Sequence, residues 1–174
     1  MLKSLIKDRR GTAAVEFAFV APVMILMYYG LAELTQGMMA DRRASHVASA
    51  IGDLVAQDTV INTTEMTDVF NVGKAIIAPF PTSGLSMRVT SIRKDSTGAI
   101  QVMWSKTSGT SLGVLSSVAS VPAGLIANNE SVILAESSYV YSSATGKALP
   151  NALTFTQKYY LKPRKTAQVA WSSS

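Results

Sequence analysis

The sequence contains no cysteine and only one histidine. The absence of cysteine excludes disulfide bonds, zinc–thiolate sites and a cysteine nucleophile. The nearest acidic residue to His46 is Asp41, five positions away and on another face of a helix, so we interpret His46 as a surface or interface residue. No HExxH motif and no glycine-rich phosphate loop is present. We therefore expect a protein that is not an enzyme and that binds no metal or other cofactor.

Charged residues are also scarce, at 16% of the 174 residues against 48% hydrophobic residues. Much of the net charge of +5 lies in residues 1–11, where four basic residues outnumber one acidic residue and give +3. The rest of the sequence has no basic stripe of the kind that binds nucleic acid, so we expect no nucleic-acid partner. Positive charges that precede an apolar run favour a cytoplasmic N-terminus and an exported remainder.

An uncharged apolar run extends from Phe17 to Ala32. As a helix it would be about 24 Å long, and its weakly polar flanks can lengthen it to the hydrocarbon thickness of about 30 Å. We expect residues 13–36 to span a membrane, with a kink at Pro22 because proline removes one backbone hydrogen bond. Apolar residues continue at helical spacing, which predicts one helix over residues 12–57 whose second half packs on a domain.

The remaining sequence predicts an α+β head. Proline residues end a second helix over Thr64–Ile77, which follows N-cap candidates at residues 62–65. Alternating apolar residues predict a β-hairpin from residues 85–92 and 100–104. Two further strands are expected over 131–141 and 152–161. The fold class is therefore α+β, with a long N-terminal transmembrane helix, a second helix and an antiparallel sheet.

The segment 105–128 is rich in Ser, Gly, Thr, Ala and Asn and is expected to be a long connection, with a short helix near 113–119 as one option. It serves either as a contact surface or as a linker without a partner. The tyrosines of the last two strands are interpreted as packing residues. The domain boundaries that follow are a basic leader at 1–11, the helix at 12–57, an extracytoplasmic head at 58–165 and a tail at 166–174.

Glu16 is an acidic residue at the start of the apolar segment. Inserting a carboxylate into a membrane costs about 3 kcal/mol, so such residues usually have a partner or reach the interface. In the first case, cleavage after Gly11 would free the amine of Thr12 one helical turn before Glu16. That amine could neutralise Glu16 of its own chain or of a neighbouring subunit. In the second case, Glu16 lies close enough to Arg10 to reach water at the membrane surface.

Arg9-Arg10-Gly11 followed by Thr12-Ala13-Ala14-Val15-Glu16-Phe17 resembles the type III signal of type IV prepilins. The longer match RRGTAAVEFAFVAPVMILMYYGLAEL, from Arg9 to Leu34, resembles the TadE-like proteins of tight adherence (Tad) pilus systems. This resemblance implies cleavage by a prepilin peptidase between Gly11 and Thr12, with Lys7, Arg9 and Arg10 as leader charges. Thr12 would be the first mature residue and a candidate for N-methylation. Glu16, followed by Phe17, would recruit the protein into the pilus.

Two departures from the major Tad pilin indicate an accessory subunit. Phe17 stands where that pilin typically has tyrosine, and the chain is far longer. We therefore expect a minor pilin or pseudopilin of the bacterial inner membrane with a periplasmic head that primes assembly or forms a pilus tip for adhesion. Its expected partners are other pilins, the prepilin peptidase, the inner-membrane assembly platform and the lipid bilayer.

Two alternatives remain at this stage. One is a signal-anchored periplasmic binding or adhesion protein that does not enter a filament. The other is a secreted protein cut by signal peptidase I, whose head is an enzyme of unknown type. The N-terminus of the mature protein separates these three possibilities.

Overall fold

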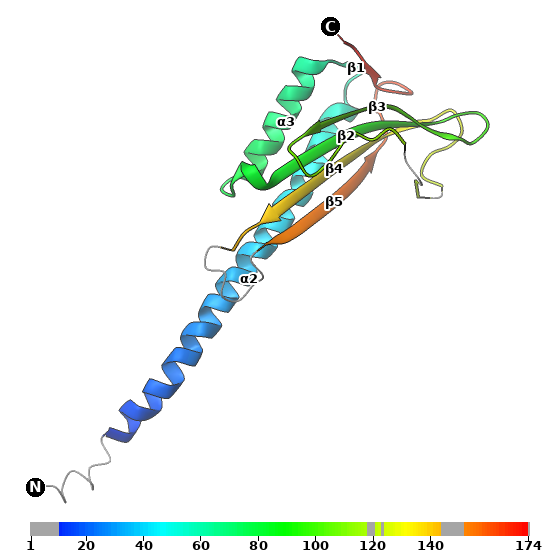
Figure 1. Cartoon of the computed structure of the whole chain (residues 1–174). Coiled ribbons are helices and arrows are strands. Elements are labelled where there is room, and N and C mark those ends of the chain that lie inside the picture. Colours follow the sequence, from blue (N-terminus) through cyan, green and yellow to red (C-terminus); the bar gives the residue numbers. More distant parts are fainter. Residues whose placement is uncertain (1–10, 118–120, 123, 144–151, 174) are drawn as a thin grey trace, which may run out of the picture.

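The computed structural model describes residues 11–117, 121–122, 124–143 and 152–173. The predicted leader charges Lys7, Arg9 and Arg10 lie outside these residues. A single helix, α2 (Thr12–Ala56, 45 residues), is the longest element, and its N-terminal half extends away from the head (Figure 1). The predicted long helix is therefore confirmed to within one residue. It continues through Pro22, and the kink there stays a prediction.

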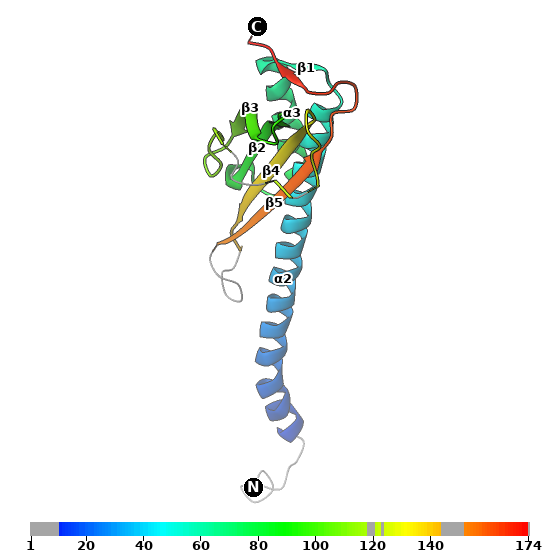
Figure 2. The same ribbon diagram turned by 90° about the vertical axis from the view of Figure 1, so that its right-hand side faces the viewer.

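The head is built on one antiparallel sheet with the strand order β3-β2-β4-β5. Its strands are β2 (Leu85–Lys94), β3 (Ile100–Ser108), β4 (Ser131–Tyr141) and β5 (Leu153–Leu161). The C-terminal half of α2 packs along β4 and β5, and α3 (Thr63–Ile77) lies beside it (Figure 2). This arrangement confirms the predicted α+β class, the hairpin and the two further strands.

Interactions between residues close in the sequence define the start of α3. Asn62 accepts a hydrogen bond from the Glu65 backbone N–H at 3.0 Å, and the Glu65 carboxylate accepts one from the Asn62 N–H at 2.9 Å. This capping box satisfies two backbone donors that the first turn leaves open. At the other end of α3, Arg43 from α2 donates to the Ile76 carbonyl at 3.0 Å, so the two helices are fixed to each other.

The main core lies between the two helices and one face of the sheet. Small residues on α2 allow a close approach, and the Ser137 hydroxyl on β4 donates to the Ala44 carbonyl at 2.7 Å. Because side chains alternate along a strand, every second residue of β2 and β4 enters this core. The fully buried side chains include Val47, Ile51, Val55, Ile77, Val89 and Ile133.

The opposite face of the sheet is covered by the segment between β3 and β4. Its apolar residues Leu115, Leu125 and Ile126 pack on Ile92, Val132 and Leu134.

The prediction of a connection over 105–128 is wrong at its start, because residues 105–108 belong to β3. The helix considered at 113–119 does not occur over 113–117, and residues 118–119 lie outside the described residues. The covering segment is thus a packed part of the head.

The prediction of a tail over residues 166–174 is wrong for residues 166–171, which belong to the head. Val169 is fully buried, and its carbonyl accepts a hydrogen bond from the Trp104 indole at 2.9 Å. Two-residue strands β1 (Val60–Ile61) and β6 (Ala170–Trp171) pair in parallel beyond it. The C-terminal segment therefore closes the end of the core that lies farthest from the projecting half of α2 (Figure 1).

The contact between α2 and the sheet gives a stability prediction at Gly52. A Cβ atom added there would lie 2.5 Å from Leu161 Cδ1 and 2.8 Å from Ala135 Cβ. The clash exceeds the gain of about 1 kcal/mol in helix propensity, so Gly52→Ala should lower the free energy of unfolding by about 1–2 kcal/mol. Urea unfolding of the full chain in detergent micelles, followed by tryptophan fluorescence, measures this change.

Gly113→Ala is the matched control, because a Cβ atom at Gly113 has no neighbour within 4 Å. We expect its urea midpoint to equal that of the parent protein. Equal midpoints for both variants would contradict the close packing of α2 at Gly52.

Candidate functional site

The projecting half of α2 is the most unusual surface of the molecule. Residues 12–32 are exposed or half-exposed along their whole length. The large apolar side chains Phe17, Phe19, Leu26, Met27 and Tyr28 are 68–76% exposed. Soluble proteins rarely leave so large an apolar patch in water, since burial is worth about 25 cal/mol per Å². Part of this helix is apolar enough to cross a membrane, and none of that part is buried by the head.

The apolar surface continues past the point where the head begins. Glu33 is the only charged residue between Glu16 and Asp41, and it is turned into the head with 5% of its surface exposed. On the outer side of α2, Leu34, Met38 and Met39 remain 44–52% exposed. The uncharged outer surface from Phe17 to Met39 is therefore about 35 Å long, which is sufficient for a hydrocarbon core of about 30 Å.

The structure places the predicted processing residues at the beginning of this helix. Gly11 is the N-cap of α2 and is exposed, and Thr12 is its first residue. Glu16 follows one turn later with its side chain exposed on the helix surface. The structure thus places Gly11, Thr12 and Glu16 within about one and a half helical turns, whereas their roles in cleavage and charge pairing stay predictions.

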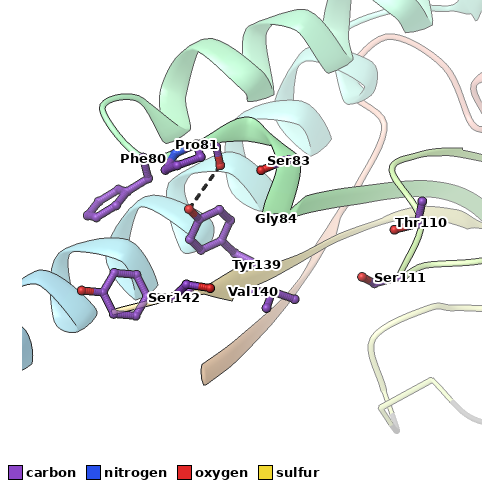
Figure 3. Close-up of a pocket in the computed structure, with 10 residues that line it drawn as sticks. Phe80, Pro81, Ser83, Gly84, Thr110, Ser111, Tyr139, Val140 and Ser142 are labelled. Carbon is purple, nitrogen blue, oxygen red and sulfur yellow. Dashed lines mark hydrogen bonds between the residues drawn. The ribbon is translucent and has the colours of Figure 1, made fainter. Parts of the chain in front are cut away.

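A second candidate site is a groove of about 440 Å³ near the end of the sheet (Figure 3). It is formed by the 3₁₀ turn η2 (Thr82–Gly84), the loop after β3 and the end of β4. Its lining carries no charged residue and consists of Phe80, Pro81, Ser83, Gly84, Thr110, Ser111, Tyr139, Val140, Tyr141 and Ser142. Such a surface offers hydroxyl and aromatic contacts but no acid–base or metal chemistry.

The tyrosines of this groove are packing residues, as predicted. Tyr139 donates to the Pro81 carbonyl at 3.2 Å, and the ring of Phe80 lies 6.2 Å from Tyr139 and 6.0 Å from Tyr141. Burial raises the pKa of both tyrosines. The negative charge of Glu33 adds to the rise in the pKa of Tyr141.

Residues 109–113, Gly-Thr-Ser-Leu-Gly, match the GxSxG pattern of a nucleophile elbow, a pattern that the sequence reasoning missed. The elbow requires a turn from a strand into a helix, whereas described residues 109–117 form an irregular loop. The Ser111 backbone N–H donates to the Ser86 hydroxyl at 2.9 Å, so this segment is fastened to the sheet. His46 lies on α2, which covers the opposite face of the sheet. The motif therefore lacks the setting that activates a serine.

The described residues contain no cluster of three or more His, Cys, Asp or Glu side chains that could hold a metal ion. Among these described residues the most buried charged side chain is Glu136 on β4, which is 1% exposed and lies on the loop-covered face of the sheet. It accepts a hydrogen bond from Arg88 Nε at 2.6 Å and pairs with Lys158 Nζ at 3.0 Å. Arg88 also donates to the Gly113 carbonyl at 2.7 Å, so this cluster fastens the loop.

Comparison with known proteins bears on the helix rather than on the groove. Residues 11–52 match a family model described as TadE-like protein. No curated protein and no solved structure matches the chain. The matched segment runs from the predicted cleavage site across the exposed apolar half of α2 and into the part covered by the head. The apolar, exposed part of this segment fits a membrane anchor. The match confirms the predicted resemblance to TadE-like proteins over residues 11–52.

Proposed function

We propose that this protein is a minor pilin or pseudopilin that takes part in the assembly of a Tad pilus. The observation that carries the proposal is the TadE-like match on a helix whose first half is apolar and exposed. In this account residues 13–36 of the precursor span the inner membrane with the leader in the cytoplasm. The prepilin peptidase cuts after Gly11, and the head stands in the periplasm.

Glu16 couples processing to assembly. Before cleavage, the carboxylate has no nearby amine in the apolar part of α2, and placing it there costs about 3 kcal/mol. Cleavage creates the positively charged amine of Thr12, which lies one turn, or about 6 Å along the axis, before Glu16. Pairing this amine with Glu16 of a neighbouring pilin lowers the cost of both charges. Only processed subunits would then pack side by side through α2.

The head supplies the difference between this subunit and a filament-forming pilin. It is fixed to the second half of α2 by the main core and by polar contacts such as Gln157 to Asp41 at 2.7 Å. A head of this size at the end of a helix suits a subunit that primes assembly or caps the filament. We assign it no catalytic role and no cofactor.

Fractionation of cells that carry the Tad system tests the proposal. We expect the protein in the inner membrane before assembly and, in small amounts, in pili sheared from the cell surface. Cells without the prepilin peptidase are expected to retain a longer form and to contain none of it in the sheared fraction. Equal amounts of processed protein in the envelope of both strains would contradict the proposal.

The groove near η2 favours a second candidate function. A neutral groove of about 440 Å³ suits a periplasmic binding or adhesion protein that stays anchored and never enters a filament. That protein would keep residues 1–11 and would be absent from sheared pili, so the same fractionation separates the two functions.

A further inference from the structure

The end of the head nearest the projecting half of α2 has no charged residue among its described segments. We call this end the proximal rim and define it as residues 75–87, 137–143 and 152–157. The three segments contain no Asp, Glu, Lys, Arg or His. Charges begin immediately outside them, at Lys74, Arg88, Glu136 and Lys158. Lys147 belongs to the connection 144–151, which lies outside the described residues. The rim instead carries exposed Pro79, Pro81, Thr82 and Ser83 around the aromatic rings of the groove.

Contacts between the sheet and α2 determine the position of the rim along the axis of α2. Ser137 on β4 is bonded to the Ala44 carbonyl, and Tyr141 lies four residues farther along the strand. That distance is about 13 Å, which α2 covers in about nine residues, so Tyr141 reaches the level of Glu33 to Gly37. The effect of the Glu33 charge on the pKa of Tyr141 agrees with this position. Both views show β4 ending and β5 starting where α2 leaves the head (Figure 1, Figure 2).

The outer surface of α2 is uncharged to the same height. Met38 and Met39 are about half exposed, and Arg42 is the first exposed charged residue beyond them. A hydrocarbon layer of about 30 Å that begins at Phe17 would end about 20 residues later, close to Gly37, and the headgroup layer would begin there. The rim and the water-facing edge of the membrane therefore lie at about the same level.

We propose that the proximal rim rests on the headgroup layer of the bilayer and holds the head at a fixed height above the membrane. This inference depends on the membrane span assigned under the proposed function. Aromatic and hydroxyl side chains are favoured at the membrane–water interface, whereas a charged residue that loses water there must be compensated. The described segments of the rim offer no cation to phosphate groups, so the proposed partner is the interface of zwitterionic phospholipid. Extraction into a filament then separates the rim from lipid.

The absence of cysteine permits a direct test with single-cysteine variants of the full chain. Ser83→Cys places a polar fluorophore on the rim, and Ser96→Cys places one at the other end of β2, where serine is also exposed. Met27→Cys places the fluorophore in the proposed membrane span and tests whether that span lies in the bilayer. Each labelled protein is placed as one copy in a phosphatidylcholine nanodisc that contains a nitroxide on the headgroup or on the acyl chain.

We expect headgroup nitroxide to quench the label at residue 83 several-fold more than the label at residue 96, and acyl-chain nitroxide to quench the label at residue 27. If residue 27 is quenched but residues 83 and 96 are quenched equally, the rim does not touch lipid, and the proposed function stands without it. If residue 27 is not quenched, the span itself is wrong, and both proposals fall. Quenching at residue 83 that requires phosphatidylglycerol would contradict a neutral contact.

Discussion

Glu16→Gln is expected to leave the protein in the membrane and to reduce the number of pili per cell by a factor of about ten or more. Glutamine keeps the size of the side chain but removes the charge, so insertion becomes easier by up to about 3 kcal/mol. The amine of Thr12 in the neighbouring subunit then has no counter-charge. A loss of only about 1.4 kcal/mol at that contact lowers its equilibrium constant tenfold. Electron microscopy counts the pili, and membrane fractionation measures insertion. Glu16→Ala should behave in the same way.

Phe17→Leu is the matched control for Glu16, because it changes the neighbouring exposed residue and keeps it apolar. It should support a normal number of pili. A normal count in Glu16→Gln would show that the carboxylate only reaches water at the membrane surface, and charge pairing would be abandoned.

Glu136→Gln is expected to lower the free energy of unfolding of the head by about 3 kcal/mol. Glu136 is 1% exposed, and its partner Arg88 is 12% exposed, so loss of the carboxylate leaves a mostly buried guanidinium without a counter-charge. Removal of one member of a buried ion pair typically costs 3–5 kcal/mol. Urea unfolding in micelles measures the loss. Hydrogen exchange should also increase over residues 109–117, because Arg88 holds the Gly113 carbonyl.

Lys158→Gln separates this effect from a general loss of charge. Lys158 pairs with the same carboxylate but is 57% exposed, and exposed pairs contribute at most about 1 kcal/mol. The double variant Arg88→Met with Glu136→Leu should recover most of the stability, since apolar residues of similar volume can replace a buried pair. If Glu136→Gln costs no more than Lys158→Gln, the cluster does not fasten the loop.

The elements with strong local signals are those that the sequence predicts well. The apolar run from Phe17 gives α2, and Asn62 and Glu65 form the capping box that begins α3. Strands β2 and β4 have bounds close to the predicted ones because alternation and flanking turn residues mark them. The TadE-like match falls on the segment where motif, charge and hydropathy all coincide.

The features that escape prediction depend on contacts between distant parts of the sequence. Strands β1 and β6 have two residues each, which is too short for any periodicity, and they pair residues 60–61 with residues 170–171. Val169 looks like part of a polar tail but fills the end of the core. Glu136 lies in a strand that is buried on both faces, so alternation gives no sign of its ion pairs. The proximal rim is likewise assembled from three separate segments.

Sequencing the N-terminus of this protein in sheared, functional pili tests the central claim most directly. The account predicts a sequence that begins at Thr12, with or without N-methylation, because the amine that pairs with Glu16 exists only after cleavage behind Gly11. Protein that still begins at Met1 while incorporated in functional pili would contradict it.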